Sequence, residues 1–232
     1  MRRMAKKQPN KQFNLTIPGS LPVRIGTYQR RRMYECFLVQ TEIGTKDTIL
    51  DVGVAADVSY ESSNYLEQWY AHKGAITAVG TDEAAFIQKL YGVCFVRASG
   101  LQLPFSDRAF NVVHSSAVLE HVGSLQNQIA FVQECCRVAY KWVFLTTPNR
   151  WFPVEFHTVL PLVHWLPKKT FRSLMRVTGY GFFAEESNLN LLSRREIAAI
   201  GAQVRGFEFR VSSVSLCGWP SNLLLTGRRL ET

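Results

Sequence analysis

The segment ILDVGVAAD, residues 49–57, decides the fold that this sequence predicts. A short apolar run ends in Asp51, and Gly53 and small residues follow it. Such a run is typical of a buried parallel strand, and a glycine directly after it makes a turn that a ligand can approach closely. In a doubly wound sheet, ligands bind at the carboxyl ends of the strands. We therefore expect a ligand site beside Asp51 and Gly53.

Apolar runs alternate with segments of helical spacing from Thr48 onward. The expected strands are 49–52, 76–79, 93–96, 110–114 and 142–146. The expected helices are 65–72, 83–90 and 126–139, preceded by a helix over 28–42 that buries Met33, Phe37 and Val39. This alternation predicts an α/β protein with a Rossmann-like, doubly wound sheet.

The rhythm of strands and helices breaks after Thr147. Residues 148–190 are rich in aromatic, proline and basic residues. We expect them to form a lid over the ligand site or a segment that packs on the sheet. Ser193 and Glu196 form the sequence pattern of a capping box, which predicts a helix up to about residue 202. Two runs, 207–216 and 221–229, then predict an antiparallel pair of strands at the edge of the sheet.

Charge is distributed unevenly along the 232 residues, whose net charge is +9. Residues 1–32 contain nine basic residues and no acidic one, and the remaining 18 basic and 18 acidic residues balance. We therefore predict a basic N-terminal arm over 1–32 and one domain over 33–232. The neutral domain excludes a broad cationic surface for nucleic acid. The arm is either solvated or in contact with anionic lipid or a phosphorylated acceptor.

No apolar run is long enough to cross a membrane, and no apolar signal core follows the basic N-terminus. We expect a cytoplasmic protein, with peripheral contact at the inner face of the membrane through the basic arm and the aromatic lid as an alternative. The five cysteines lack the spacing of metal ligands, as do His157 and His164, so no metal is expected.

Two further segments carry a resemblance to a known family. LQLPFSDRAFNVVHSSAVLEHV (101–122) and TTPNRWFPVEFH (146–157) resemble class I S-adenosylmethionine (SAM)-dependent methyltransferases. The first is similar to the group that contains the ubiquinone and menaquinone methyltransferases. The second is similar to a bacterial subgroup linked to polysaccharide or lipid modification. The resemblance covers residues 48–229 and implies a three-layer α/β/α fold, a seven-stranded sheet with an antiparallel last strand, and SAM as cofactor.

The resemblance also assigns cofactor-binding positions. They are Asp51 and Gly53 in the first turn, Ser99, Gly100 and Leu101 in the adenine loop, and Ser115 and Ser116 at the end of the fourth strand. Three positions depart from the family pattern. Ala55 and Ala56 replace glycines, Ser99 replaces an acid, and Gly80 stands where the ribose-binding acid usually ends the second strand. We expect Asp82 to supply that carboxylate.

Methyl transfer from a sulfonium needs alignment and removal of a proton from the acceptor. His121 and His157 are the candidate bases, because they follow the fourth and fifth strands and imidazole titrates near neutral pH. A histidine bonded to backbone at a helix start, or packed in a loop, is the alternative for each. Asn149, Arg150 and Trp151 are the candidate acceptor contacts, with turn formation as the alternative for Asn149.

The sequence therefore predicts a methyltransferase for a small-molecule, sugar-linked or lipid-linked acceptor. The alternatives are a methyltransferase for RNA or protein and a non-catalytic, SAM-binding partner protein. A dinucleotide-dependent enzyme is excluded, because the second glycine that a dinucleotide loop needs is absent after Gly53. The acceptor, the methylated atom type and the oligomeric state are not fixed by the sequence.

Overall fold

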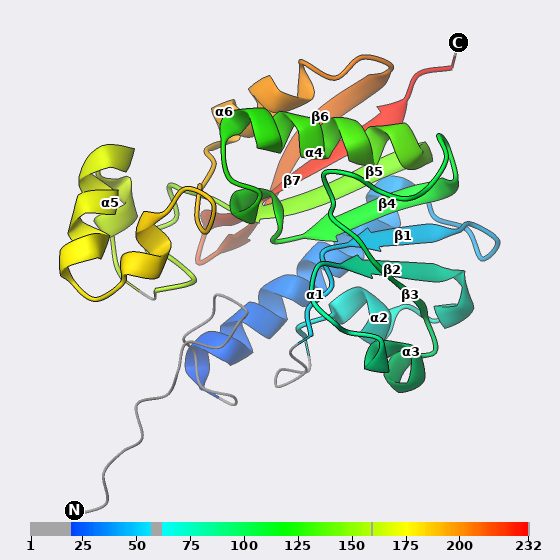
Figure 1. The fold of residues 1–232 in the computed structure, drawn as a ribbon, viewed down its shortest axis with the longest axis horizontal. Coiled ribbons are helices and arrows are strands. Elements are labelled where there is room, and N and C mark those ends of the chain that lie inside the picture. The colour runs from blue at the N-terminus through cyan, green and yellow to red at the C-terminus, as the bar shows by residue number, and fades with distance from the viewer. Residues whose placement is uncertain (1–19, 57–61, 159, 232) are drawn as a thin grey trace, which may run out of the picture.

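The computed structural model describes residues 20–56, 62–158 and 160–231. A seven-stranded sheet in the order β3-β2-β1-β4-β5-β7-β6 runs through the centre of the molecule (Figure 1). Its strands are β1 (Ile49–Val52), β2 (Ile76–Gly80), β3 (Cys94–Arg97), β4 (Phe110–Ser116), β5 (Ala139–Pro148), β6 (Phe207–Leu216) and β7 (Trp219–Arg229). Strands β1 to β5 pair in parallel, and β7 pairs antiparallel with both β5 and β6. The expected doubly wound sheet with an antiparallel last strand is confirmed.

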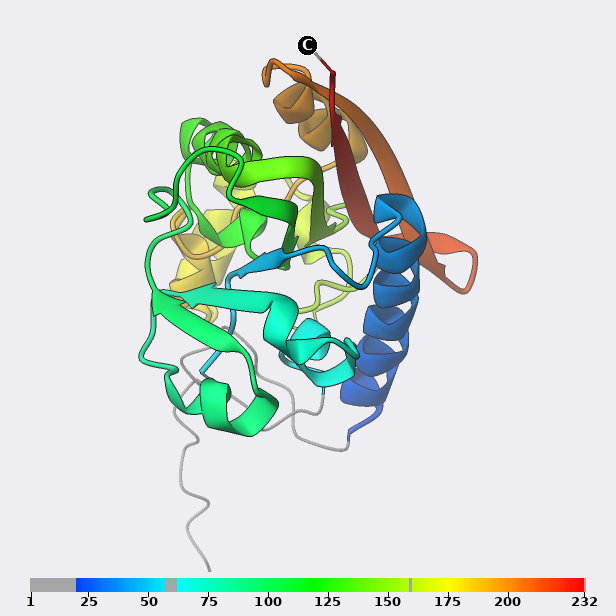
Figure 2. The same cartoon turned by 90° about the vertical axis from the view of Figure 1, so that its right-hand side faces the viewer.

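Helices cover both faces of the sheet, as Figure 2 shows from the side. One face packs against α4 (Leu125–Val138) and α6 (Arg194–Gly201), through an apolar cluster that includes Phe131 and Ile197. The other face packs against α1 (Leu21–Thr41), α2 (Tyr65–Trp69) and α3 (Phe86–Tyr91), through a cluster that includes Phe37 and Leu66. The two clusters give the three-layer α/β/α arrangement that the resemblance implied.

The first helix differs from its prediction. It begins at Leu21 rather than at residue 28, and Pro22 in its first turn is favourable there because the proline nitrogen needs no helical partner. Residues 21–32 of the predicted basic arm are therefore helical, whereas residues 1–19 lie outside the described residues. Met33 and Phe37 are buried as expected, but Val39 is 76% exposed, because it lies on the side of the helix away from the sheet.

The strand β5 is longer at both ends than the sequence predicted. It pairs with β7 from Trp142 to Pro148, so a neighbour formed much later in the chain extends its C-terminal end, whereas at the N-terminal end Ala139 pairs with Phe110 of β4. The capping box at the start of α6 is confirmed: Ser193 Oγ accepts from the Glu196 amide, and the Glu196 side chain accepts from the Ser193 amide.

The segment after β5 folds into short elements at one end of the sheet, on the left of Figure 1. These are η3 (Val163–Trp165), α5 (Lys168–Val177) and η4 (Gly181–Ala184). They share a small apolar cluster of their own, which includes Phe171, Met175 and Phe183. The segment is thus a packed unit beside the carboxyl ends of the strands.

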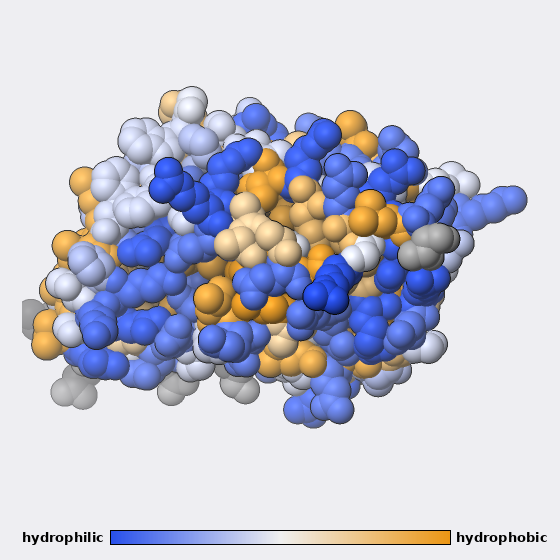
Figure 3. All heavy atoms as spheres, turned by 90° about the horizontal axis from the view of Figure 1, so that it is seen from above, coloured by the Kyte–Doolittle hydropathy of each residue, from blue (hydrophilic) through white to orange (hydrophobic). Residues whose placement is uncertain are grey.

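The outer surface over α4 and α6 is mostly hydrophilic, with apolar side chains gathered near its centre (Figure 3). These helices direct their apolar sides to the sheet, as amphipathic helices on a sheet do. None of the helices described is both long and apolar enough to cross a membrane.

Candidate functional site

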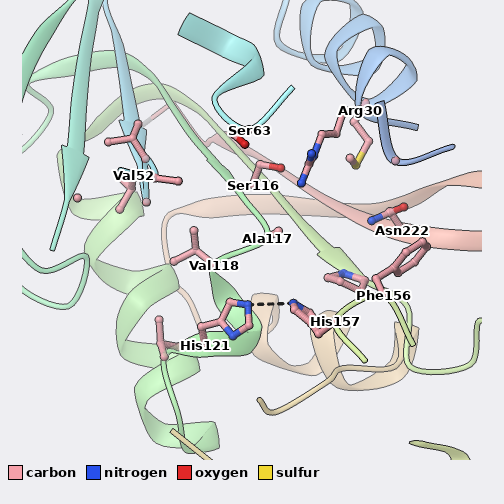
Figure 4. Close-up of a pocket in the computed structure, with 18 of the residues that line it drawn as sticks. Arg30, Val52, Ser63, Ser116, Ala117, Val118, His121, Phe156, His157 and Asn222 are labelled. Atoms are coloured by element: carbon pink, nitrogen blue, oxygen red, sulfur yellow. Dashed lines mark hydrogen bonds between the residues drawn. The ribbon is translucent and has the colours of Figure 1, made fainter. Parts of the chain in front are cut away.

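A cavity of 660 Å³ opens at the carboxyl ends of the parallel strands. The turns after β1, β2, β3 and β4 form one side of it, and α1 with the segment after β5 forms the other. This is the place where doubly wound sheets bind ligands, and the volume lies within the usual range of about 300–1,000 Å³ for small-molecule sites. Figure 4 shows the side chains of both sides pointing into the same space.

The turn after β1 brings the backbone to the cavity wall. Gly53 has a φ of +105°, and a Cβ there would lie 2.1 Å from Cγ2 of Val118. The Gly53 amide donates to the carbonyl of Val79, which ties the turn to β2. Glycine is favoured by this conformation and this close approach, and the role of the turn in binding a cofactor stays a prediction.

The departure at Gly80 has a steric reason. A Cβ at Gly80 would lie 2.8 Å from the carbonyl oxygen of Val54, so the turn after β1 occupies the space of a side chain. Asp82, two residues later, lines the cavity instead. A cradle that a Cβ would fill, with a carboxylate beside it, fits the ribose end of a nucleoside cofactor.

Six of the eight predicted cofactor residues line the cavity: Gly53, Asp82, Ser99, Gly100, Leu101 and Ser116. Ser115 and Asp51 do not. Ser115 is buried, and its Oγ donates to the Val52 carbonyl at 2.6 Å. The side chains of a strand alternate between its two faces, and Ser115 points into the core rather than toward the cavity.

Asp51 belongs to a buried polar cluster on the other face of β1. Its Oδ1 lies 2.6 Å from Nδ1 of His114, and Nε2 of His114 lies 2.8 Å from the Tyr65 hydroxyl. Burial raises the pKa of Asp51 to about 7 and lowers the pKa of His114 to about 4. The structure thus places Asp51 in a neutral, hydrogen-bonded pair beneath the cavity rather than in its wall.

The wall opposite the glycine turn is largely apolar. Phe152, Val154 and Phe156 come from the segment after β5, and Ile25 and Met33 come from α1. Polar groups on this side were missed by sequence reasoning. They are Gln29 and Arg30 of α1, Ser63 before α2 and Asn222 of β7. No motif marks them, because α1 and β7 reach the site only through the packing of the whole sheet.

Arg30 points into the cavity from α1 in Figure 4. Its guanidinium donates to the Ser62 hydroxyl at 3.0 Å. The basic stretch that contains Arg30 was predicted as an arm, and the place of Arg30 in a helix that lines the cavity differs from a solvated arm, whereas contact with lipid or a phosphorylated acceptor stays a prediction. A cation on the acceptor side favours an acceptor that carries negative charge or strong hydrogen-bond acceptors.

Both candidate bases line the cavity, and they touch each other. Nε2 of His121 lies 3.1 Å from Nε2 of His157, the contact marked in Figure 4. Nδ1 of His157 donates to Oε1 of Glu155 at 2.6 Å, and Nδ1 of His121 donates to the Asn188 carbonyl at 2.6 Å. The predicted bond of His121 to backbone is therefore present together with its position in the cavity.

The charges of this cluster follow from its contacts. Burial alone would raise the pKa of Glu155, but the nearby His157 and hydrogen bonds from His157 and Thr158 lower it to about 2. Burial alone would lower the pKa of His157, but the charge of Glu155 and its hydrogen bond raise it above its ordinary value. Burial and the positive charge of His157 lower the pKa of His121 to about 3.

The predicted acceptor contacts Asn149, Arg150 and Trp151 do not line the cavity. Asn149 Nδ2 donates to the Pro220 carbonyl at 2.8 Å and its Oδ1 accepts from the Trp151 amide, so it forms the turn that its alternative reading described. Arg150 donates to the Leu166 carbonyl, and Trp151 is 45% exposed. The turn at Asn149 directs the next aromatic residue, Phe152, into the cavity instead.

Comparisons with known proteins agree with this geometry. Residues 52–141 match the family model described as a methyltransferase domain. No curated protein sequence matches the chain.

Solved structures of methyltransferases have the same fold at low sequence identity. A SAM-dependent methyltransferase from Thermotoga maritima, a possible histamine N-methyltransferase, has a TM-score of 0.57 at 13% identity, over 90% of this chain and 92% of its own. Magnesium protoporphyrin IX methyltransferase from Synechocystis with bound S-adenosylhomocysteine (SAH) has a TM-score of 0.57 at 14% identity, over 90% and 86%. The 1,6-didemethyltoxoflavin-N1-methyltransferase from Burkholderia thailandensis has a TM-score of 0.58 at 14% identity, over 90% and 81%.

Proposed function

We propose that the chain is a class I SAM-dependent methyltransferase and that it methylates a small-molecule, sugar-linked or lipid-linked acceptor, which the methyltransferase-domain match over residues 52–141 and the shared fold support. One observation carries this proposal. One cavity has a glycine-lined side formed by the strand turns, an apolar side, and a histidine pair to which both sides contribute. A cofactor and a second, partly apolar molecule can therefore meet there.

The cofactor side is formed by groups that fit SAM. Backbone at Gly53 and Gly80 allows close approach, the Asp82 carboxylate can accept from ribose hydroxyls, and Ser99 to Leu101 form the loop for the adenine. SAM supplies a methyl group on a positively charged sulfur, which is already a strong electrophile. The chain has to align that methyl with the acceptor, and it needs no nucleophile of its own.

His121 and His157 are the proposed catalytic residues. Both line the cavity between the cofactor side and the apolar side, where the acceptor atom would approach. Glu155 fixes the ring of neutral His157 through Nδ1, and it stabilises the positive charge that the ring gains when Nε2 takes a proton from the acceptor. Once His157 carries that proton on Nε2, Nε2 of His121 can accept a hydrogen bond from it at the observed 3.1 Å.

The acceptor is proposed to be amphipathic. Phe152 and Phe156 stack in parallel with ring centroids 5.2 Å apart, and they present an apolar wall, while Arg30 and Asn222 supply polar contacts. The segment 148–190 is proposed as the lid that selects this acceptor. Peripheral contact with a membrane is part of the same proposal, because Trp151 and Trp219 are 45% and 46% exposed.

Calorimetric titration with SAM and SAH tests the cofactor site. We expect micromolar affinity, a loss of about tenfold in Asp82→Ala, and no change in the control Glu83→Ala, an exposed neighbour outside the cavity lining. Asp51→Asn should change affinity little, because Asp51 lies beneath the wall. Methyl transfer from labelled SAM to saccharide, quinone and lipid acceptors then identifies the acceptor class.

The alternatives predict other outcomes. Tight SAM binding without turnover on these acceptors would support a non-catalytic partner protein, and salt-sensitive transfer to RNA would support a nucleic-acid methyltransferase. Folded protein that binds neither SAM nor SAH would contradict the proposed function.

A further inference from the structure

Three potential ligand side chains meet under the acceptor side of the cavity: Glu120, His121 and His157. One donor atom from each lies within 4.8 Å of the other two. The two Nε2 atoms are 3.1 Å apart, and Oε1 of Glu120 is 3.9 Å from Nε2 of His121. Glu120 and His121 belong to η2 (Leu119–His121), whereas His157 comes from the segment after β5.

The hydrogen bonds of the two rings fix where their lone pairs point. A backbone carbonyl can only accept, so Nδ1 of His121 carries the proton that is bonded to Asn188. The Glu155 carboxylate likewise accepts from Nδ1 of His157. In two neutral rings, both Nε2 atoms then carry lone pairs that face each other. Two facing lone pairs at 3.1 Å require a positive charge between them, supplied by a proton or by a metal cation.

The third side chain favours a metal cation. Glu120 is fully buried, and its Oε2 accepts from the Thr147 hydroxyl at 2.9 Å. Its Oε1 accepts no hydrogen bond from the described part of the chain, although it is aimed at the histidine pair. A buried carboxylate oxygen without a partner is costly, and a single proton between the rings does not provide one. A cation bound to both Nε2 atoms would also bind Oε1.

We propose that Glu120, His121 and His157 bind one divalent transition-metal cation, with zinc as the best-matched ion. Two imidazoles and one carboxylate are ligands that zinc prefers, at about 2.0–2.2 Å from the metal. Tetrahedral ligands at such distances lie about 3.4 Å from one another, between the two separations that the cluster already has. Each ring also has the outer partner that metal-bound histidines usually have, a carboxylate for His157 and a backbone carbonyl for His121.

The fourth position of such a site faces the acceptor. His121 and His157 line the cavity, and Glu120 lies behind them, so the side left open by the three ligands is the cavity side. A cation there would hold an oxygen or nitrogen of the acceptor and lower its pKa. This role rests on the proposed function and deepens it, because the histidine pair would then act on the acceptor through the cation.

No metal was expected from the sequence, because His157 and His164 lack the spacing of metal ligands. The structure separates these two residues: Nε2 of His164 donates to the Phe152 carbonyl at 2.7 Å, away from the cluster. His121, 36 residues before His157, takes the place beside it. His164 therefore offers a matched control, since it is a buried histidine of the same segment outside the proposed site.

The test is a calorimetric titration of the full chain with zinc chloride after removal of metals by chelator dialysis, with SAH titrated in parallel. We expect one bound zinc per chain. Affinity should fall at least 100-fold in Glu120→Gln and in His157→Gln, and it should be unchanged in His164→Gln. Cobalt(II) provides a second measurement that needs no variant, because bound cobalt at a site of low coordination number gives visible absorption bands that zinc then displaces.

Each outcome bears on one proposal. Absence of zinc binding and of cobalt bands, in protein that still binds SAH, overturns the metal site and leaves the proposed function standing. Zinc binding that is equally strong in all three variants overturns the assignment to these residues. Zinc binding in protein that does not bind SAH supports the metal site and contradicts the proposed function.

Discussion

Two buried histidines in this protein make the same first contact and differ in the second. His114 and His157 each place Nδ1 2.6 Å from a carboxylate oxygen, of Asp51 and of Glu155 respectively. Nε2 of His114 then meets a tyrosine hydroxyl, whereas Nε2 of His157 meets another imidazole nitrogen. The first cluster lies on the face of the sheet that packs against α1 and α2, and the second lies in the cavity wall.

The two histidine–carboxylate pairs differ in charge state: the first is neutral, and the second is an ion pair. Burial raises the pKa of Asp51 to about 7 and lowers the pKa of His114 to about 4, so this pair is neutral at intermediate pH. In the other pair, His157 and the bonds to Glu155 lower the pKa of Glu155 to about 2, and the pKa of His157 is raised. Thr158 donates twice to Glu155, and such donors stabilise the carboxylate anion. A histidine–carboxylate contact alone therefore does not mark a functional site; the groups around it decide.

The largest expected effect is that substitution of His157 lowers kcat, whereas substitution of His114 lowers stability. His157→Gln should lower kcat by about 10²- to 10⁴-fold, because the acceptor loses its catalytic partner. His114→Gln should leave kcat of the folded protein within a few-fold and cost about 2–5 kcal/mol of stability, because Asp51 and Tyr65 lose a buried partner. Single-turnover transfer and urea unfolding measure the two effects. An equal loss of kcat in both variants would contradict the distinction.

The second expected effect tests the tyrosine that satisfies His114. Tyr65→Phe removes the hydroxyl bonded to Nε2 and leaves a buried imidazole nitrogen without its partner. We expect a loss of about 1–3 kcal/mol in the free energy of unfolding, with unchanged SAH affinity. Tyr70→Phe is the control, because Tyr70 follows the same helix and its ring contacts His72 rather than His114. Similar losses in both variants would argue against a specific role for the bond.

The third expected effect concerns pH. Burial, and the negative charge of Asp51 once Asp51 ionises, raise the pKa of Glu67 well above its ordinary value, so the folded chain keeps a proton that the unfolded chain releases. Stability that is present below pH 4.5 is then lost as pH rises toward the folded pKa, by about 1.4 kcal/mol per pH unit. The raised pKa of Asp51 makes the folded chain bind a proton more, and the lowered pKa of His114 makes it bind one fewer. These two contributions to the pH dependence nearly cancel. Glu67→Gln should therefore flatten the profile of unfolding free energy between pH 5 and 8, and parallel profiles for the two proteins would contradict this.

The sequence predicted much of the fold because its strands are continuous apolar runs. The 49–52 and 207–216 strands have the predicted bounds, while β5 continues past residue 146 because it pairs there with β7, formed far away in the chain. Periodicity placed α4 to within a residue, but it did not show that α1 begins at Leu21.

The cavity was predicted where motifs mark backbone turns, and missed where packing alone brings residues in. Gly53 and Ser99 to Leu101 line it because turns at strand ends are local features. Arg30 and Asn222 reach it only after the helix and the last strand pack against the sheet, which no local pattern shows. The pairing of His121 with His157 depends on the same long-range packing.

The smallest expected effect tests why Glu155 differs from Asp51. Thr158→Val removes the hydroxyl that donates to Oε2 of Glu155 at 2.7 Å and retains the size of the side chain and the amide donor. A carboxylate with one donor fewer orients His157 less firmly, and outer partners of metal ligands typically contribute about 10- to 100-fold in affinity. We expect zinc affinity to fall about tenfold, at the lower end of that range, because the Thr158 amide still holds Oε2. Thr178→Val, whose hydroxyl donates to the Leu174 carbonyl on the exterior of α5, is the control and should bind zinc as the wild type does. If both variants bind equally well, the second donor is not what separates the two carboxylates, and the contact between the Nε2 atoms of His121 and His157 alone distinguishes the cavity cluster from the buried one.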